Sequence, residues 1–282
     1  MSTPAKGAAG CTRRLANGEV VRGGLPEVFP DWQDEERWLI LTPHDDDPAL
    51  SAALLLSEAA RIGVAIRVRI ATDGSMGYTS RVSAQDVVAR RREETLQSFT
   101  CCGVHDVDWY NYPDTRLHLW QGRLLAQDNA PQKQHVVAGH TGLQNSIVAE
   151  LRALRPTRLF LLSAQDYHPD HKTVHQEALI SVFHACGDIW PELGTPLPRA
   201  PWIHELAAYC PFAVDPDIQI IGTDAQFTAK LAAIEAFASQ TQIATLVAAV
   251  RTAGPVEYVR SFAFATYSPS SYAGLFPNTP QA

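Results

Sequence analysis

Two short stretches of this 282-residue chain combine histidine and aspartate closely enough to suggest chemistry. The first, "PHDDDP", covers residues 43–48, and the second, "HPDH", covers residues 168–171. A run of acidic residues is most often a solvated surface. Here, however, each stretch comes soon after an apolar run and leads into a helical pattern. Loops that leave the carboxyl ends of parallel strands are where open α/β sheets bind ligands, so the pattern favours a site.

The side-chain types in the two stretches indicate which ligand the site would bind. Imidazole and carboxylate without thiolate suit a divalent first-row metal, and zinc in a hydrolytic site usually has three protein ligands plus water. Either stretch alone is a weak signal, because an aspartate at a helix start is more often only a cap. Two such loops on parallel strands of one sheet would open on the same edge, however. The pair therefore predicts a shared metal ion.

The elements that must position these loops alternate along the chain. Apolar or alternating runs predict strands at residues 38–41, 66–72, 107–112, 157–163, 205–210 and 218–222. Helical patterns lie at residues 49–62, 84–101, 144–155, 171–185 and 224–238. This alternation predicts a single α/β domain, with a mostly parallel sheet covered by helices on both faces.

Three segments depart from the alternation. Residues 1–36 are rich in Gly and Pro and predict an N-terminal arm or cap on a domain of residues 37–282. The polar insertion at 124–142 is long enough to be either functional or loosely ordered. The insertion at 186–202, with its prolines and tryptophans, could line a pocket, although packing over the sheet is the commoner role.

Composition excludes several classes of protein. A net charge of -7 argues against nucleic acid or an anionic membrane as the main partner. The N-terminus lacks the apolar core of a signal peptide, and no apolar run approaches the roughly 20 residues that span a bilayer. The five cysteines form neither an even disulfide framework nor a CxxC pair. We therefore expect a soluble, cytoplasmic protein with reduced thiols; its oligomeric state stays open.

The two stretches together resemble the LmbE/PIG-L deacetylases, whose first motif is AHPDDE and whose second is HPDH or similar. Further similar stretches are "ATDGSMG" (71–77), "RRREETLQSFTCCGV" (90–104), "YPDTRL" (112–117) and "KLAAIEAFASQ" (230–240). The resemblance covers roughly residues 37–260. It implies a Rossmann-like fold and a zinc enzyme that removes the acetyl group from an N-acetylglucosamine-type sugar or its conjugate, so the expected partner is a small N-acetylated sugar or glycoconjugate.

The resemblance also implies roles for the residues of the two motifs. One Zn²⁺ per chain would be held by His44, Asp47 and His171. Asp46 would be the general base that deprotonates the zinc-bound water. His168 would stabilise the oxyanion or protonate the leaving amine.

Substrate contacts are implied for two residues outside these motifs. Asp114 matches an aspartate that contacts the sugar hydroxyls, and Arg91 lies where relatives have an arginine that helps hold the group attached to the sugar. Each has a plainer alternative, because Arg91 sits in a run of three arginines typical of a solvated helix face and Asp114 follows Pro113 as a turn aspartate would. His175 shares a helix face with His171 but is expected to pack or be solvated.

The chain departs from the first motif at two positions, where Asp45 replaces proline and Pro48 replaces glutamate. Asp45 could accept a hydrogen bond from a ligand histidine and so orient its ring, or be a solvated carboxylate. The lost glutamate leaves open a non-catalytic, metal- or glycan-binding homologue. A further alternative is an amidase of a larger thiol or antibiotic conjugate. Serine hydrolysis and dinucleotide binding are disfavoured because neither a GxSxG elbow nor a GxGxxG loop is found.

Overall fold

Two strands that are buried on both faces lie side by side in the sheet. They are β3 (Arg37–Thr42) and β8 (Arg158–Leu162), which pair in parallel in a computed structural model that describes residues 10–77, 84–127 and 135–275. In β3, Trp38 and Ile40 pack into one hydrophobic core, whereas Leu39 and Leu41 pack into another. Side chains of a strand alternate between its faces, so a strand covered on both sides must be apolar throughout.

The sheet is parallel in one half and antiparallel in the other. Within the described residues its order is β2-β1-β10-β11-β9-β8-β3-β4-β5. The parallel half adds β9 (Trp202–Leu206), β4 (Ala65–Thr72) and β5 (Asp106–Tyr112) to the two central strands. The antiparallel half contains β11 (Val256–Phe262), β10 (Ile218–Ile221), β1 (Gly10–Arg14) and β2 (Val20–Gly23).

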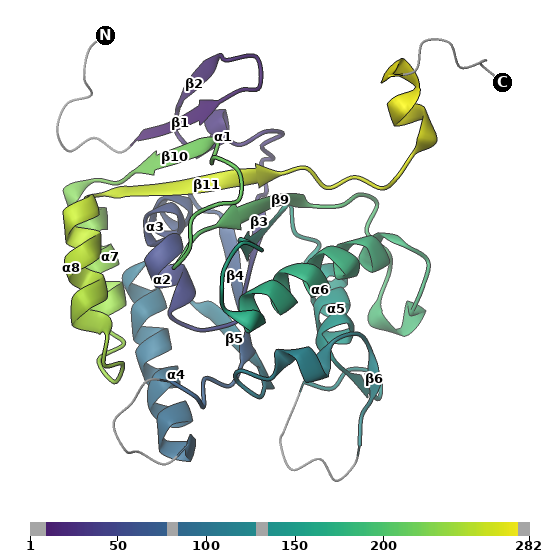
Figure 1. Ribbon diagram of the computed structural model, residues 1–282, viewed down its shortest axis with the longest axis horizontal. Helices are drawn as coiled ribbons and strands as arrows, with labels where there is room; N and C mark the ends of the chain where they lie inside the picture. The colour runs from purple at the N-terminus through teal and green to yellow at the C-terminus, as the bar shows by residue number, and fades with distance from the viewer. Residues whose placement is uncertain (1–9, 78–83, 128–134, 276–282) are drawn as a thin grey trace.

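Helices cover both faces of this sheet, which confirms the predicted fold class (Figure 1). One face packs against α2 (Asp47–Ser51), α3 (Ala53–Arg61), α4 (Ala84–Cys101), α7 (Asp224–Glu235) and α8 (Ile243–Ala253). The other face packs against α5 (Leu143–Leu154) and α6 (Pro169–Cys186). No helix among the described residues is long and apolar enough to cross a membrane.

The direction in which the chain adds strands reverses at β3. From β3 the chain adds β4 and β5 on one side, then crosses through α5 to place β8 on the other side. At such a switch point the loops after two neighbouring strands diverge and leave a crevice, where ligands of open α/β sheets bind. The loops that follow β3 and β8 are the two that carry the histidine–aspartate stretches.

Part of the predicted N-terminal arm belongs to the sheet. Strands β1 and β2 form an antiparallel pair, and β1 pairs with β10 in the antiparallel half. The short helix α1 (Leu25–Val28) then leads toward β3, with its Leu25 and Val28 buried in the core. The division of the chain at residue 36 stays a prediction.

The two predicted insertions differ in how they attach. In the first, β6 (Leu124–Leu125) pairs with β7 (His140–Thr141), and residues 128–134 lie outside the described part of the chain. The second is held by Arg152, whose guanidinium donates to six backbone carbonyls between residues 184 and 194. Leu193 and Leu197 bury their side chains in the core beneath, so this segment packs on the domain.

Candidate active site

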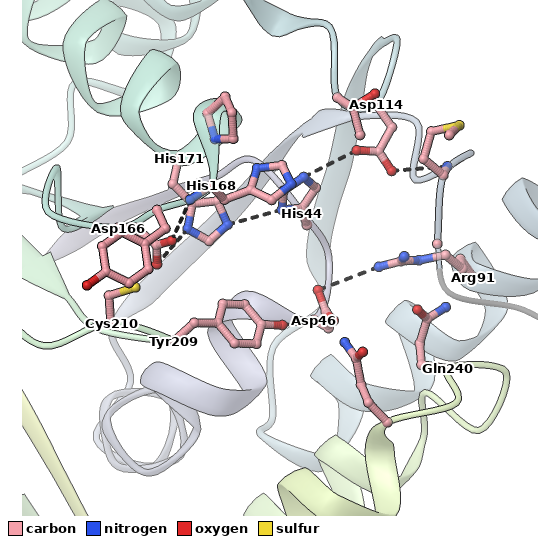
Figure 2. A pocket seen from close by; sticks show the side chains of 16 residues that line it. His44, Asp46, Arg91, Asp114, Asp166, His168, His171, Tyr209, Cys210 and Gln240 are labelled. Carbon is pink, nitrogen blue, oxygen red and sulfur yellow. Dashed lines mark hydrogen bonds and ion pairs between the residues drawn. The ribbon is translucent and has the colours of Figure 1, made fainter.

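A cavity of about 680 Å³ opens at the carboxyl ends of the parallel strands (Figure 2). Its lining comes from the loops after all five parallel strands, from α4, from the first turn of α6 and from the segment between α7 and α8. The lining residues are His44, Asp46, Met76, Gly77, Arg91, Asp114, Thr115, Asp166, Tyr167, His168, Pro169, His171, Tyr209, Cys210, Gln240 and Gln242. Most of the predicted site residues are among them, whereas neither insertion contributes a described lining residue.

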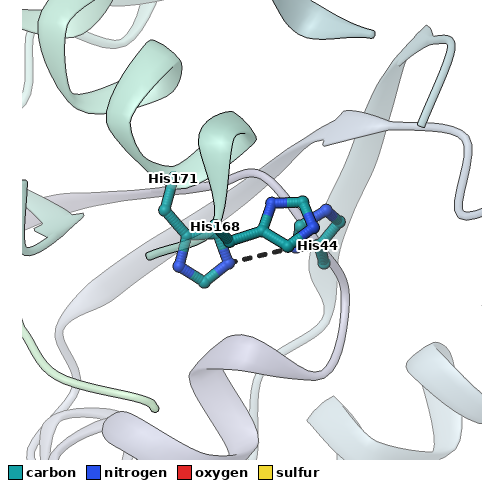
Figure 3. A group of neighbouring side chains, drawn as sticks. All are labelled: His44, His168 and His171. Atoms are coloured by element: carbon teal, nitrogen blue, oxygen red, sulfur yellow. Dashed lines mark hydrogen bonds between the residues drawn. The ribbon is translucent and has the colours of Figure 1, made fainter. Parts of the chain in front are cut away.

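The three residues predicted to bind metal come together beside this cavity, which His44 and His171 line, while the Asp47 side chain is fully buried. His44 Nδ1 lies 3.1 Å from His171 Nε2, as Figure 3 shows for the two rings. Asp47 Oδ1 lies 3.4 Å from His171 Nε2, and Asp47 Oδ2 lies 3.5 Å from His44 Nδ1. Residues 127 positions apart in the chain thus face one another across the crevice between β3 and β8.

Asp47 is held in place by its own loop. Its Oδ2 accepts hydrogen bonds from Thr42 Oγ1 and from the His44 backbone N–H, each 3.0 Å long. Pro48 follows in the first turn of α2, where a missing N–H leaves no hydrogen bond unmade. The Asp47 side chain is 0% exposed, and its Oδ1 has no hydrogen-bond partner among the described residues.

The other ring nitrogen of His44 faces two further carboxylates. His44 Nε2 lies 3.2 Å from Asp114 Oδ1 and 3.5 Å from Asp170 Oδ2. Both of these carboxylates accept hydrogen bonds from backbone N–H groups, Asp114 from Met76 and Asp170 from Thr115 and Leu117. Within the described part of the chain, two groups of side chains are close enough to hold an ion, His44–His168–His171 and His44–Asp114–Asp170, and His44 belongs to both.

These residues fit a divalent metal ion. Two imidazole nitrogens that face each other at 3.1 Å, beside a buried carboxylate oxygen without a partner, form a donor set that suits zinc or a similar ion. Burial lowers the pKa of His44, but hydrogen bonds with Asp114, Asp170 and Asp47 outweigh it and hold that pKa well above its usual value. A metal would therefore have to displace a proton to bind here.

Asp46 lies beside this cluster and lines the cavity. Its carboxylate accepts a 3.3 Å hydrogen bond from the Tyr209 hydroxyl and lies 3.5 Å from Nη2 of Arg91 (Figure 2). Burial is the largest influence and raises the pKa of Asp46 to about 6, while Arg91 opposes the rise. This carboxylate can therefore exchange a proton near neutral pH.

His168 stands at the N-cap of α6 and lines the cavity above His44. Its Nδ1 accepts a 3.2 Å hydrogen bond from the Asp170 backbone N–H, and its ring centroid is 4.5 Å from that of His44. Burial, then the neighbouring His44 and His171, lower the pKa of His168. A neutral ring that accepts at Nδ1 carries its proton on Nε2.

Arg91 and Asp45 form an ion pair at the cavity wall. Arg91 Nε donates to Asp45 Oδ2 at 3.0 Å, its Nη2 contacts Asp45 Oδ1, and Thr95 Oγ1 also donates to Asp45. Asp45 is 3% exposed and Arg91 is 4% exposed. A solvated carboxylate at Asp45 and a solvated helix face at Arg91 are therefore both wrong. The substrate contact predicted for Arg91 stays a prediction.

Several lining residues are not among the site residues predicted from the sequence. Asp166, whose Oδ2 lies 3.1 Å from His171 Nδ1, comes just before the "HPDH" stretch but has no motif of its own. Tyr209 falls in the strand predicted at 205–210, whereas that strand ends at Leu206. Gln240 lies just after the helix predicted at 224–238. His175 packs as expected, with its Nε2 2.9 Å from Glu205 Oε1.

The fold and the cavity define a Rossmann-like α/β protein with a histidine–aspartate cluster at the carboxyl edge of its parallel strands. Residues 39–182, more than half of the chain, match the PIG-L family model, which is described as GlcNAc-PI de-N-acetylase. The chain therefore belongs to the LmbE/PIG-L family.

Similar proteins include deacetylases and one enzyme of another class. The uncharacterized deacetylase YaiS of Escherichia coli is 24% identical over 70% of this chain and 88% of its own. The N,N'-diacetylchitobiose deacetylase of Pyrococcus horikoshii shares the fold with a TM-score of 0.59 at 22% identity, over 87% of this chain and 88% of its own. The 4-carboxy-2-hydroxymuconate hydratase GalB of Pseudomonas putida has a TM-score of 0.60 at 18% identity, over 83% of this chain and 99% of its own. Similarity of fold alone does not decide between deacetylation and hydration.

Proposed function

We propose that this protein is a zinc-dependent N-deacetylase that removes the acetyl group from an N-acetylglucosamine-type amino sugar or its conjugate. The observation that carries the proposal is the convergence of His44, Asp47 and His171 beside Asp46 in one cavity. Family membership supports deacetylation as the reaction, because the family model is described as GlcNAc-PI de-N-acetylase. A hydrated metal site alone would serve a hydratase equally well.

We assign the metal to Nδ1 of His44, the Asp47 carboxylate and Nε2 of His171. The alternative group around Nε2 of His44 is less suitable because backbone N–H groups already donate to both oxygens of Asp170, whereas Oδ1 of Asp47 has no hydrogen-bond partner among the described residues. When bound, a divalent ion supplies Lewis-acid chemistry, polarising a carbonyl and lowering the pKa of water to about 7.

The chain's own residues supply the proton transfers. Asp46 takes the proton of the attacking water, because it lines the cavity, lies outside the assigned ligand set and has a pKa that burial raises to about 6. Tyr209 and Arg91 fix the position of its carboxylate. The Nε2–H of His168 donates a hydrogen bond to the carbonyl oxygen as negative charge develops there. The proton that Asp46 has taken passes to the leaving amine as the C–N bond breaks.

The test is release of acetate from N-acetylglucosamine and from N,N'-diacetylchitobiose. The purified protein is stripped with a chelator and then assayed with and without added Zn²⁺. We expect acetate release only with metal. Metal binding without acetate from any N-acetylated sugar would contradict the proposal in favour of a non-catalytic homologue. Acetate release from larger amide conjugates alone would instead favour the amidase alternative.

A further inference from the structure

The arginine in the wall of the cavity is already paired. Among the described lining residues, Arg91 is the sole arginine or lysine, and the lining carboxylates are Asp46, Asp114 and Asp166. The Arg91 guanidinium makes its hydrogen bonds with Asp45, which lies behind the wall, through Nε at 3.0 Å and through Nη2. Its Nη2 also lies 3.5 Å from Asp46 Oδ1.

Packing holds the guanidinium in place at the wall of the cavity. A Cβ added at Gly77 would lie 2.5 Å from Arg91 Nη1 and 2.9 Å from Gln240 Nε2, so backbone and side chain are in close contact there. A Cβ at Gly74 would lie 3.3 Å from Arg91 Nε. On its other side, Asp45 is fixed by the Thr95 hydroxyl. The arginine is therefore enclosed between Asp45 and the loop after β4.

We propose that Asp45 determines substrate specificity by committing Arg91 to the wall of the cavity. The inference rests on the proposed function and concerns the group attached to the sugar. Without a carboxylate at position 45, the Arg91 guanidinium would be free to hold an anionic group. Here its charge is matched by Asp45, and the remaining lining carboxylates repel anions. The preferred substrate is then an N-acetylglucosamine derivative whose attached group is neutral or cationic, not a phosphate or carboxylate.

Three matched α-glycosides of N-acetylglucosamine test this specificity: the methyl glycoside, the 2-aminoethyl glycoside and the 1-phosphate. For the parent protein we expect kcat/KM on the 1-phosphate to be at least about tenfold below that on the methyl glycoside, because the phosphate meets carboxylates without a charge-assisted hydrogen bond to offset them. Asp45→Asn leaves Arg91 with an unmatched charge, which the phosphate can accept, and should raise this ratio about tenfold.

The double variant D45N/R91Q is the matched control. It restores neutrality at the wall without an arginine, so the gain on the 1-phosphate should disappear. If the double variant gains as much as D45N, Arg91 is not the group that Asp45 controls. Equal kcat/KM of the parent protein on all three glycosides would overturn the proposal by itself, whether or not D45N folds. If circular dichroism shows that D45N is unfolded, Asp45→Pro is used in its place, since proline is the residue that the family motif has at this position.

Calorimetric binding of the same three glycosides separates this inference from the proposed function. A parent protein that releases no acetate, yet binds the methyl glycoside at least about tenfold more tightly than the 1-phosphate, contradicts the proposed function and supports the specificity. A parent protein that releases acetate but binds all three equally supports the function and overturns the specificity.

Discussion

At the scale of single residues, His44 joins two halves of the site. Its Nε2 lies 3.2 Å from Asp114 Oδ1, so a proton on Nε2 is donated to that carboxylate. The lone pair of Nδ1 then faces Asp47 and His171. A carboxylate that fixes the tautomer and orientation of a ligand histidine commonly increases metal affinity.

This arrangement predicts that Asp114 contributes to metal binding. Asp114→Ala should weaken zinc affinity by about 10- to 100-fold, the usual effect of losing such a partner, while Asp114→Asn, which keeps an accepting oxygen, should weaken it less. Competition with a chelating dye measures both. Asp108→Ala, an exposed residue of β5, is the control. Unchanged affinity in Asp114→Ala would leave Asp114 with its predicted sugar contact alone.

The roles of Asp46 as general base and Asp47 as metal ligand should be separable by mutation. Asp46→Asn keeps the size of the side chain but cannot take a proton, so acetate release should fall at least about 100-fold while zinc stays bound. Asp47→Asn should lose zinc as well as rate, because an amide is a poor zinc ligand. Zinc content and acetate release are measured on the same samples. If Asp46→Asn hydrolyses as fast as the parent, the base is another residue.

At the scale of elements, β9 carries a histidine that cannot accept a proton without cost. His204 is 0% exposed, packs against the rings of Phe29 and Phe160, and has no hydrogen-bond partner among the described residues on either ring nitrogen. Burial therefore lowers the pKa of His204 well below its usual value. In the unfolded chain the same imidazole takes a proton below a pH of about 6.5.

The free energy of unfolding should consequently fall in acid. Above pH ~6.5 neither state binds the proton, and below it only the unfolded state does, so His204 removes up to ~1.4 kcal/mol per pH unit. His204→Phe has no imidazole to protonate at this position. The free energy of unfolding of this variant should therefore fall by about 1.4 kcal/mol less than that of the parent between pH 7.5 and 5.5. Urea unfolding at both pH values measures the difference. Equal losses in the two proteins would show that His204 titrates normally.

The elements predicted from sequence are those with an uninterrupted apolar signal. Strands β3 and β8 are buried on both faces, and the apolar runs locate them to within a residue or so. The prediction for β9, 205–210, is displaced from its actual span, Trp202–Leu206, because its buried His204 and Glu205 interrupt the apolar run. Strands β1, β2 and β11 are not predicted from the sequence, because their side chains are mixed in polarity and partly exposed. Helix α8 is not predicted either.

The candidate site divides in the same way. His44, Asp47 and His171 belong to short motifs after neighbouring strands, so the sequence predicts that they meet. The pairing of Asp45 with Arg91 joins residues 46 positions apart on different elements, and local pattern carries no information on it. Tyr209 enters the cavity from a loop without a recognisable motif.

At the scale of the whole molecule, the site depends on the parallel half of the sheet. Each of its five strands ends in a loop that contributes to the cavity, and no described residue of β1, β2, β10 or β11 does. The loops after β3 and β8 bring together buried carboxylates and imidazoles that a dication would offset. Metal binding should therefore stabilise the entire domain.

Chelation should lower the melting temperature of the parent protein, and added Zn²⁺ should restore it. At a free metal concentration of 100 Kd, linkage alone contributes about 2.7 kcal/mol to the free energy of unfolding. Differential scanning calorimetry with and without chelator measures the shift. Asp47→Asn should show almost none. A shift in Asp47→Asn as large as in the parent would place the metal elsewhere.

The enclosure of Arg91 also has a consequence for how the sequence can diverge. Gly77 leaves no room for a Cβ beside Arg91 Nη1. A guanidinium could swing away to admit one, but only where Asp45 does not hold it. Positions 45 and 77 should therefore covary among homologous chains: an acidic residue at 45 should accompany glycine at 77, while proline at 45 should permit larger residues there. Positions 45 and 77 are distant in sequence, yet the residue at one limits which residues the other can accept.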